Sequence, residues 1–141
     1  MQISLTGSVN LDGTGGTVTR VLCSGPSEGP LDPFETEFVR AVQQVQPTGG
    51  EWEALIPRAL RSVSVPFQIV KEFTTLPEAE EFCLQHEASL PYNCTLQILS
   101  DTGGGTPTSF TAQHAEVLSV NCRRMGHSVL VSYRILATEL A

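Results

Sequence analysis

Three histidines are the side chains of this chain best suited to bind a metal ion or to move a proton. They are His86, His114 and His127. None forms an H-x-x-x-H or H-E-x-x-H pair, the spacing that places two imidazoles on one helix face. His114 and Glu116 match only the first half of a zinc-deaminase motif, because no P-C-x-x-C follows. The sequence therefore predicts no metal site, and we expect His86 at the surface near the C-terminal end of a helix, where a cation is favourable.

Four widely spaced cysteines offer thiols for nucleophilic attack or for disulfides. They are Cys23, Cys83, Cys94 and Cys122. No two of them form a C-x-x-C pair, and each lies among apolar neighbours, which is typical of reduced, buried thiols. We expect Cys83 on the apolar face of a helix, where a thiol packs in the core rather than acting as a nucleophile.

The remaining polar patterns also have simple structural explanations. The carboxylates of Glu78, Glu80, Glu81 and Glu87 fall on one predicted helix and are expected to face solvent. The glycine-rich run at residues 13–16 precedes a strand and has no lysine nearby, so it indicates a turn rather than a phosphate-binding loop. We predict no catalytic, cofactor-binding or metal-binding residues, and we do not expect an enzyme.

Composition narrows the class of protein further. The formal net charge is −7 and only 16% of the residues are charged. An acidic chain is poorly suited to specific nucleic-acid binding, which depends on lysine and arginine at the phosphates. No apolar run approaches the roughly 20 residues that span a bilayer, and the first residues lack a signal-peptide pattern. We therefore expect no membrane partner and synthesis in a cytoplasm.

Alternation of apolar and polar side chains marks six segments as strands. They are residues 2–9, 17–23, 63–69, 94–98, 115–122 and 128–136. Phe110 and Ala112 are expected to begin a further short strand, and the expected total is seven or eight strands. Residues 34–46 fit a helical stripe and a strand face equally well, so they stay unassigned. Pro66 removes a backbone donor from the strongest strand and is expected at a sheet edge or a bulge. The last two strands should form a hairpin joined through residues 123–127.

One helix is predicted at about residues 76–90. Thr75 precedes Glu78 by three residues, which matches a capping box, and Pro77 occupies the first turn, where its missing N–H is harmless. Pro91 prevents continuation. With one helix among many strands, we predict a single mainly-β domain over residues 1–141, an antiparallel β-sandwich or barrel with this helix on its flank.

Long loops rich in glycine, proline, threonine and serine are the features that favour binding or assembly over catalysis. They lie near residues 10–17, 24–33 and 101–107. Loops of this length are often functional, and strands at the edge of an open sheet can pair with another subunit. We expect an oligomer interface at Asp12, Gly13, Pro30, Pro33, Trp52, Gly104, Arg123 and Arg124.

The order of elements resembles the tail-tube fold of long-tailed bacteriophage tube and tail-tip subunits and of related contractile injection systems. The resemblance lies in the segment at residues 62–73, the helix at residues 75–90 and the closing strands at residues 115–122 and 128–136. It implies a non-enzymatic virion structural protein, assembled in the host cytoplasm as a homo-oligomeric ring (tube, terminator or tip) beside other tail or neck proteins. A negative wall would suit passage of DNA through its lumen.

A second class stays open, a monomeric ligand- or carbohydrate-binding β-sandwich module. Such modules usually display several aromatic side chains on one face. Apart from its phenylalanines, this chain has only Trp52, Tyr92 and Tyr133.

Overall fold

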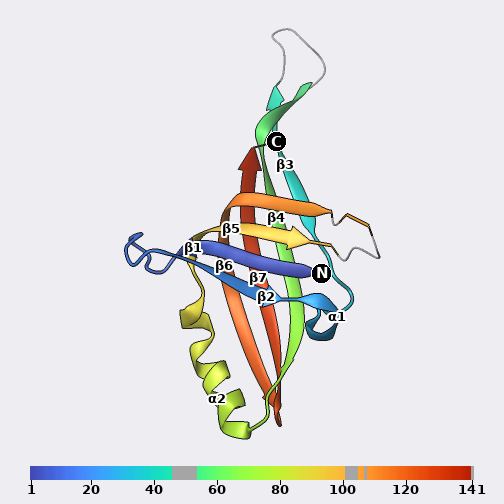
Figure 1. Ribbon diagram of the computed structural model, residues 1–141. Coiled ribbons are helices and arrows are strands. Elements are labelled where there is room, and N and C mark those ends of the chain that lie inside the picture. Colours follow the sequence, from blue (N-terminus) through green and yellow to red (C-terminus); the bar gives the residue numbers. More distant parts are fainter. Residues whose placement is uncertain (46–53, 101–104, 107, 141) are drawn as a thin grey trace.

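The structure is a computed structural model that describes residues 1–45, 54–100, 105–106 and 108–140 (Figure 1). Seven strands form one antiparallel sheet in the order β2-β1-β5-β6-β7-β4-β3. They are β1 (Gln2–Ser8), β2 (Thr17–Cys23), β3 (Glu37–Val45), β4 (Ala54–Glu72), β5 (Tyr92–Leu99), β6 (Ser109–Met125) and β7 (Ser128–Leu140). The predicted mainly-β antiparallel fold with a flanking helix is confirmed, and the sheet does not close into a barrel.

The strand β6 joins two halves of the sheet. One half contains β2, β1 and β5, and the other contains β7, β4 and β3. Its first part pairs with β5 as far as the Cys94–Ala115 pair, and from His114 onward it pairs with β7. The register shifts between Val117 and Ser119, a bulge that bends the strand. Figure 1 shows β1 and β5 crossing β4 and β7 at a large angle, so the sheet folds over itself.

One hydrophobic core fills the space between the two halves. Alternate residues of β4 are buried at Val63, Val65, Phe67 and Ile69, as the period-two pattern predicted. Their cluster includes buried residues of β1, β5 and β7, such as Ile3, Leu96 and Ile135. Because each strand hides one set of alternate residues, the other set faces outward and remains open to solvent or to a partner.

The helix α2 (Leu76–Gln85) flanks the sheet beside β6 and β7 (Figure 1). The Glu78 N–H donates to the Thr75 hydroxyl at 3.4 Å, which confirms the predicted N-terminal cap. The predicted helix at residues 76–90 is interrupted, since α2 ends at Gln85 and a short 3₁₀ turn covers Glu87–Ser89. A one-turn helix, α1 (Gly25–Glu28), lies within the predicted loop at residues 24–33. No helix in the described part of the chain is long and apolar enough to cross a membrane.

Two sequence assignments change with the structure. The ambiguous segment at residues 34–46 contains the strand β3, because it pairs with β4 from Glu37–Ser64 to Val45–Ala54. The turn predicted at residues 123–127 is shorter, since Arg123 to Met125 continue β6 and pair with β7.

Pro66 lies on β4 beyond Ser64, the last residue of that strand to pair with β3. The side of β4 that faces away from β7 there lies next to the loop that precedes β3. The Leu31 N–H donates to the Gln68 carbonyl oxygen at 2.8 Å, so the main-chain groups of Gln68 point away from β7. Main-chain groups of every second residue in a strand point to the same side, so the nitrogen of Pro66 also points away from β7. The missing N–H of Pro66 therefore costs no hydrogen bond with β7. The expected edge position of Pro66 is confirmed.

Gly7 permits the closest approach between β1 and β5. A Cβ built at Gly7 would collide with the Tyr92 carbonyl oxygen and would lie 3.0 Å from the Cys94 sulfur. We expect Gly7→Ala to lower the free energy of unfolding by about 1–3 kcal/mol, the usual cost of overpacking. Urea denaturation followed by circular dichroism measures this. The control is Thr17→Ala on exposed β2, which should change stability by less than about 0.5 kcal/mol; equal losses for the two variants would contradict the packing argument.

Candidate functional site

A two-stranded arm is the most distinctive surface feature. We define the arm as β3 together with residues 54–64 of β4, which pair with it. Pairing between β4 and β7 stops at Leu60–Leu140, so the outer part of the arm has no third strand among the described residues. Figure 1 shows β3 and the start of β4 extending past the other strands. An isolated two-stranded ribbon is marginally stable in water, so the arm gains most by packing against something else.

The arm exposes several apolar side chains along its length. Val39 is 52% exposed, Val42 51% and Leu60 46%. Val42 lies on the outer part, whereas Val39 and Leu60 lie at the base, where β4 still pairs with β7. Exposed apolar side chains along a projecting ribbon are typical of a contact surface.

The base of the arm is held to the folded body by Phe38 and Arg61. The Phe38 ring meets Phe110 of β6 edge-on at 5.5 Å, and the Arg61 guanidinium lies 4.9 Å from the Phe38 ring centre. Arg61 also forms a salt bridge with Glu139 of β7. These contacts fix the direction in which the arm leaves the sheet.

A shallow groove opens on the outer side of the sheet at the bulge of β6. We call it the bulge groove; its volume is about 410 Å³. Its lining residues are Asn93, His114, Ala115, Glu116, Leu118, Leu136 and Thr138. Leu118 is 56% exposed and Leu136 is 39% exposed, so the groove presents apolar surface to solvent.

Glu116 has a defined position in the bulge groove. One carboxylate oxygen accepts a hydrogen bond from the Asn93 N–H at 2.8 Å. Asn93 has a positive φ of 52°, a backbone conformation that asparagine tolerates better than most residues. A smaller hollow of about 70 Å³, also lined by Glu116 and Leu118, separates this part of β6 from the segment at residues 87–92.

A chain of ring contacts connects the sheet to α2. Tyr133 of β7 is buried and stacks on Phe67 of β4 at 4.9 Å. Its hydroxyl lies 2.6 Å from His86 Nε2, just after α2. The His86 ring stacks on Phe82 at 4.4 Å, and Phe82 meets Phe73 at 5.2 Å. The expectation that His86 is a simple surface cation is wrong, because its ring is partly buried and paired with a core hydroxyl.

Both partners of this pair are held in their neutral forms. Burial raises the pKa of the Tyr133 hydroxyl above its usual range. Burial, together with the nearby Lys71 ammonium, lowers the pKa of His86 from 6.5 to about 4. A neutral imidazole beside a neutral phenol can still share a hydrogen bond, with either group as donor. The pair thus positions α2, and the His86 ring also lines an open surface hollow of about 350 Å³ beside that helix.

The four cysteines are free thiols. Cys23 and Cys94 are buried, while Cys83 and Cys122 are half-buried and packed against the core. Burial raises the pKa of the Cys94 thiol to about 11, and the same cause raises the pKa of Cys23 and Cys122. A thiol with a raised pKa is less often ionised and is a poorer nucleophile at neutral pH.

The residues predicted for an oligomer interface fall in separate places. Asp12 and Gly13 lie in the β1–β2 turn, where the Asp12 carboxylate accepts hydrogen bonds from the Thr14 hydroxyl and N–H at 2.6 and 3.0 Å. Those bonds lower the pKa of Asp12. Arg123 and Arg124 are exposed on β6 where it enters the hairpin with β7, away from the β1–β2 turn.

The other four predicted interface residues are divided between the β4 edge and undescribed positions. Pro30 and Pro33 belong to the segment beside the β4 edge. Trp52 and Gly104 lie outside the described residues. The sequence did not predict the arm or the bulge groove, although a strand is one of the two alternatives for residues 34–46 and would place Phe38, Arg40 and Val42 on one face.

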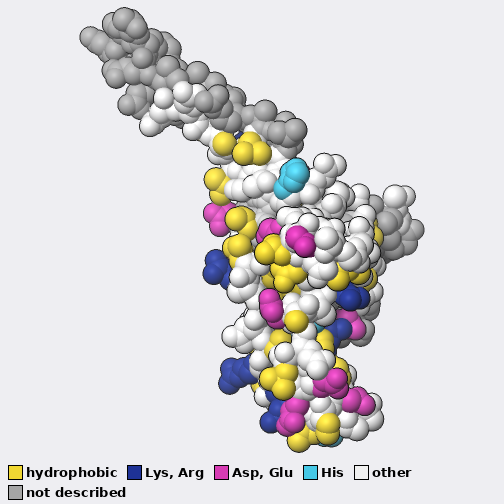
Figure 2. Space-filling model, turned by 90° about the vertical axis from the view of Figure 1, so that its left-hand side faces the viewer, with side chains coloured by type: hydrophobic (Ala, Val, Ile, Leu, Met, Phe, Trp, Pro, Cys, Tyr) yellow, Lys and Arg dark blue, Asp and Glu magenta, His cyan; other side chains and the backbone are white. Residues whose placement is uncertain are grey.

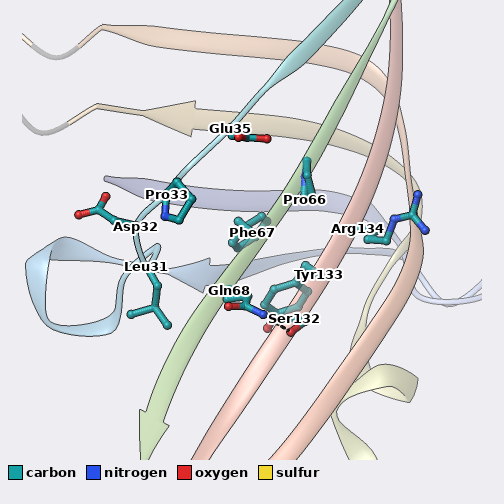
Figure 3. A pocket seen from close by; sticks show the side chains of 10 residues that line it. All are labelled: Leu31, Asp32, Pro33, Glu35, Pro66, Phe67, Gln68, Ser132, Tyr133 and Arg134. Carbon is teal, nitrogen blue, oxygen red and sulfur yellow. Dashed lines mark hydrogen bonds between the residues drawn. The ribbon is translucent and has the colours of Figure 1, made fainter.

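A hollow of about 350 Å³ lies between the segment at residues 31–35 and the strands β4 and β7 (Figure 3). Gln68 donates to the Ser132 hydroxyl at 3.1 Å within it. Figure 3 shows the Arg134 guanidinium directed away from Asp32 and Glu35, so the charged groups do not converge on one point. Ligand sites usually combine an apolar hollow with converging polar groups, which this arrangement lacks.

Within the described residues, no group of three or more histidine, cysteine or acidic side chains is placed to hold a metal ion. Figure 2 shows side chains of both charge signs and hydrophobic ones interspersed over one face of the molecule. No known family model matches the chain, and no curated protein is significantly similar to it.

The His86–Tyr133 pair predicts a specific loss of stability in acid. His86 has a pKa of about 4 when folded and about 6.5 when unfolded, so between these values the unfolded chain binds a proton that the folded chain excludes. The contribution of neutral His86 to the free energy of unfolding is therefore complete above about pH 6.5, falls as the pH drops, and is lost below about pH 4.

Comparison of melting temperatures from pH 7 to pH 4 tests this. His86→Gln stays neutral and keeps a hydrogen-bonding group. Its melting temperature should therefore fall less between pH 7 and pH 4 than that of the wild type. His127→Gln changes an exposed turn residue and should follow the wild-type curve. If His86→Gln is as sensitive to acid as the wild type, the sensitivity comes from other groups and the prediction is wrong.

Proposed function

We propose that this chain is a non-enzymatic virion structural protein of a tailed bacteriophage, a self-assembling subunit of a tail or neck ring. The observation that carries the proposal is the arm, whose outer part lacks a third strand and exposes Val42, while Val39 and Leu60 are exposed at its base. An arm of this kind is costly for a solitary protein and useful for one that reaches a neighbour.

The open sheet supports the same proposal. Its terminal strands, β2 and β3, each have one side without a strand partner among the described residues. Edges of this kind are ready templates for pairing with another chain. Since β2 and β3 are different surfaces, contact between them would be head-to-tail, the geometry that produces rings or filaments.

The order of elements adds to the case. The long strand β4, the helix α2 and the closing hairpin of β6 and β7 occupy the segments that carry the resemblance to tail-tube subunits. The net charge of −7 is consistent with a ring whose wall does not bind DNA passing through it.

Self-association of the purified full chain tests the proposal. We expect large symmetric oligomers by multi-angle light scattering and rings by negative-stain electron microscopy. Val42→Asp should weaken association at least about tenfold, because a carboxylate in an apolar contact must lose its water. Leu84→Asp is the matched control; Leu84 is 85% exposed on α2, far from the arm in sequence and in the fold, and its substitution should leave association unchanged.

A wild-type chain that stays monomeric at high concentration, with no rings in the microscope, would contradict the proposed function. If Val42→Asp associates as strongly as the wild type, the arm is not part of the contact between subunits.

A further inference from the structure

We propose that the bulge groove receives the arm of a second copy of this chain. This inference rests on the proposed function and names the surface that completes the contact. In both the groove and the arm, exposed apolar side chains accompany a local shape, a hollow in one case and a projection in the other.

The apolar parts of the two surfaces match. The groove of about 410 Å³ has Leu118 and Leu136 at its surface. The outer part of the arm is only two strands wide and presents Val42. Docking would remove Leu118, Leu136 and Val42 from water without any rearrangement of the sheet.

The charges match as well. Arg40 is two residues from Val42 on the same face of β3, is exposed, and forms no ion pair with any described residue. Glu116 lines the groove together with Leu118 and Leu136, and the Asn93 N–H occupies only one of its carboxylate oxygens. Each surface therefore places one charge of opposite sign among apolar side chains, which favours one register of docking over others.

The two surfaces belong to different copies. The strand β4 runs from the arm into the body and pairs with β7 without a break from Leu60–Leu140 to Glu72–Ser128. Folding the arm back onto the groove of its own chain would break this ladder. A contact between unlike surfaces of two copies leaves one arm and one groove free at its ends, so it continues until a ring closes.

Charge reversal in the full chain tests the pairing of Arg40 with Glu116. Arg40→Glu and Glu116→Arg should each weaken association at least about tenfold in sedimentation velocity, and the double variant should return to within about threefold of the wild type. Glu116→Gln keeps an oxygen for the Asn93 N–H and should weaken association less than Glu116→Arg does. Circular dichroism melts identify any variant that has not folded.

Photo-crosslinking keeps the test decisive if a charge variant fails to fold. A benzophenone amino acid at position 42 should attach, between copies, to peptides containing residues 114–118 or 136–138. Crosslinks to other surfaces within the assemblies, or folded single variants that the double variant does not rescue, would overturn the inference while leaving the proposed function standing. A wild-type chain that never associates would instead overturn the proposed function, and the inference with it.

Discussion

The ladder between β4 and β7 is the contact on which the rest of the structure depends. It pairs the two strands continuously from Leu60 to Glu72, and it alternates buried side chains on its inner face with exposed ones outside. One end of β4 continues into the arm, and the neighbour of β7 is the bent strand β6. The arm and the bulge groove are thus fixed relative to each other by a single pair of strands. Since a slip of one residue would turn every inner side chain outward, the core also fixes the positions of both surfaces.

The phenol of Tyr133 imposes a second constraint on this ladder. A hydroxyl buried in an apolar core is costly unless it has a hydrogen-bonding partner, and His86 supplies that partner from the end of α2. The helix therefore contributes one polar contact at a defined place in addition to its apolar face. The stacked rings of Phe82 and Phe67 on either side limit the positions that α2 can take.

Much of the fold could be predicted from the sequence because local patterns and tertiary packing agree. The alternation through Val63 to Ile69 and the Thr75 cap are local signals, and both are confirmed. The segment containing β3 could not be assigned, since its apolar residues fit two periods and its strand character depends on pairing with the distant Ser64.

The candidate site was harder to predict than the fold. The bulge groove exists because a register shift in β6 brings Leu118 beside Leu136, two positions that no sequence pattern connects. His86 was misjudged for a related reason, since its partner Tyr133 is 47 residues away along the chain. The interface predicted at the loops rests on their composition, which indicates exposure but not which surfaces lie together.

The continuity of β4 also has a mechanical consequence. A neighbour that pulled on the arm along its length would load the β4–β7 hydrogen bonds in shear, all at once, rather than opening them one after another like a zipper. A strand held this way resists force as a unit until the whole ladder gives. The same strand that extends the arm from the body therefore also carries tension from the arm into the core.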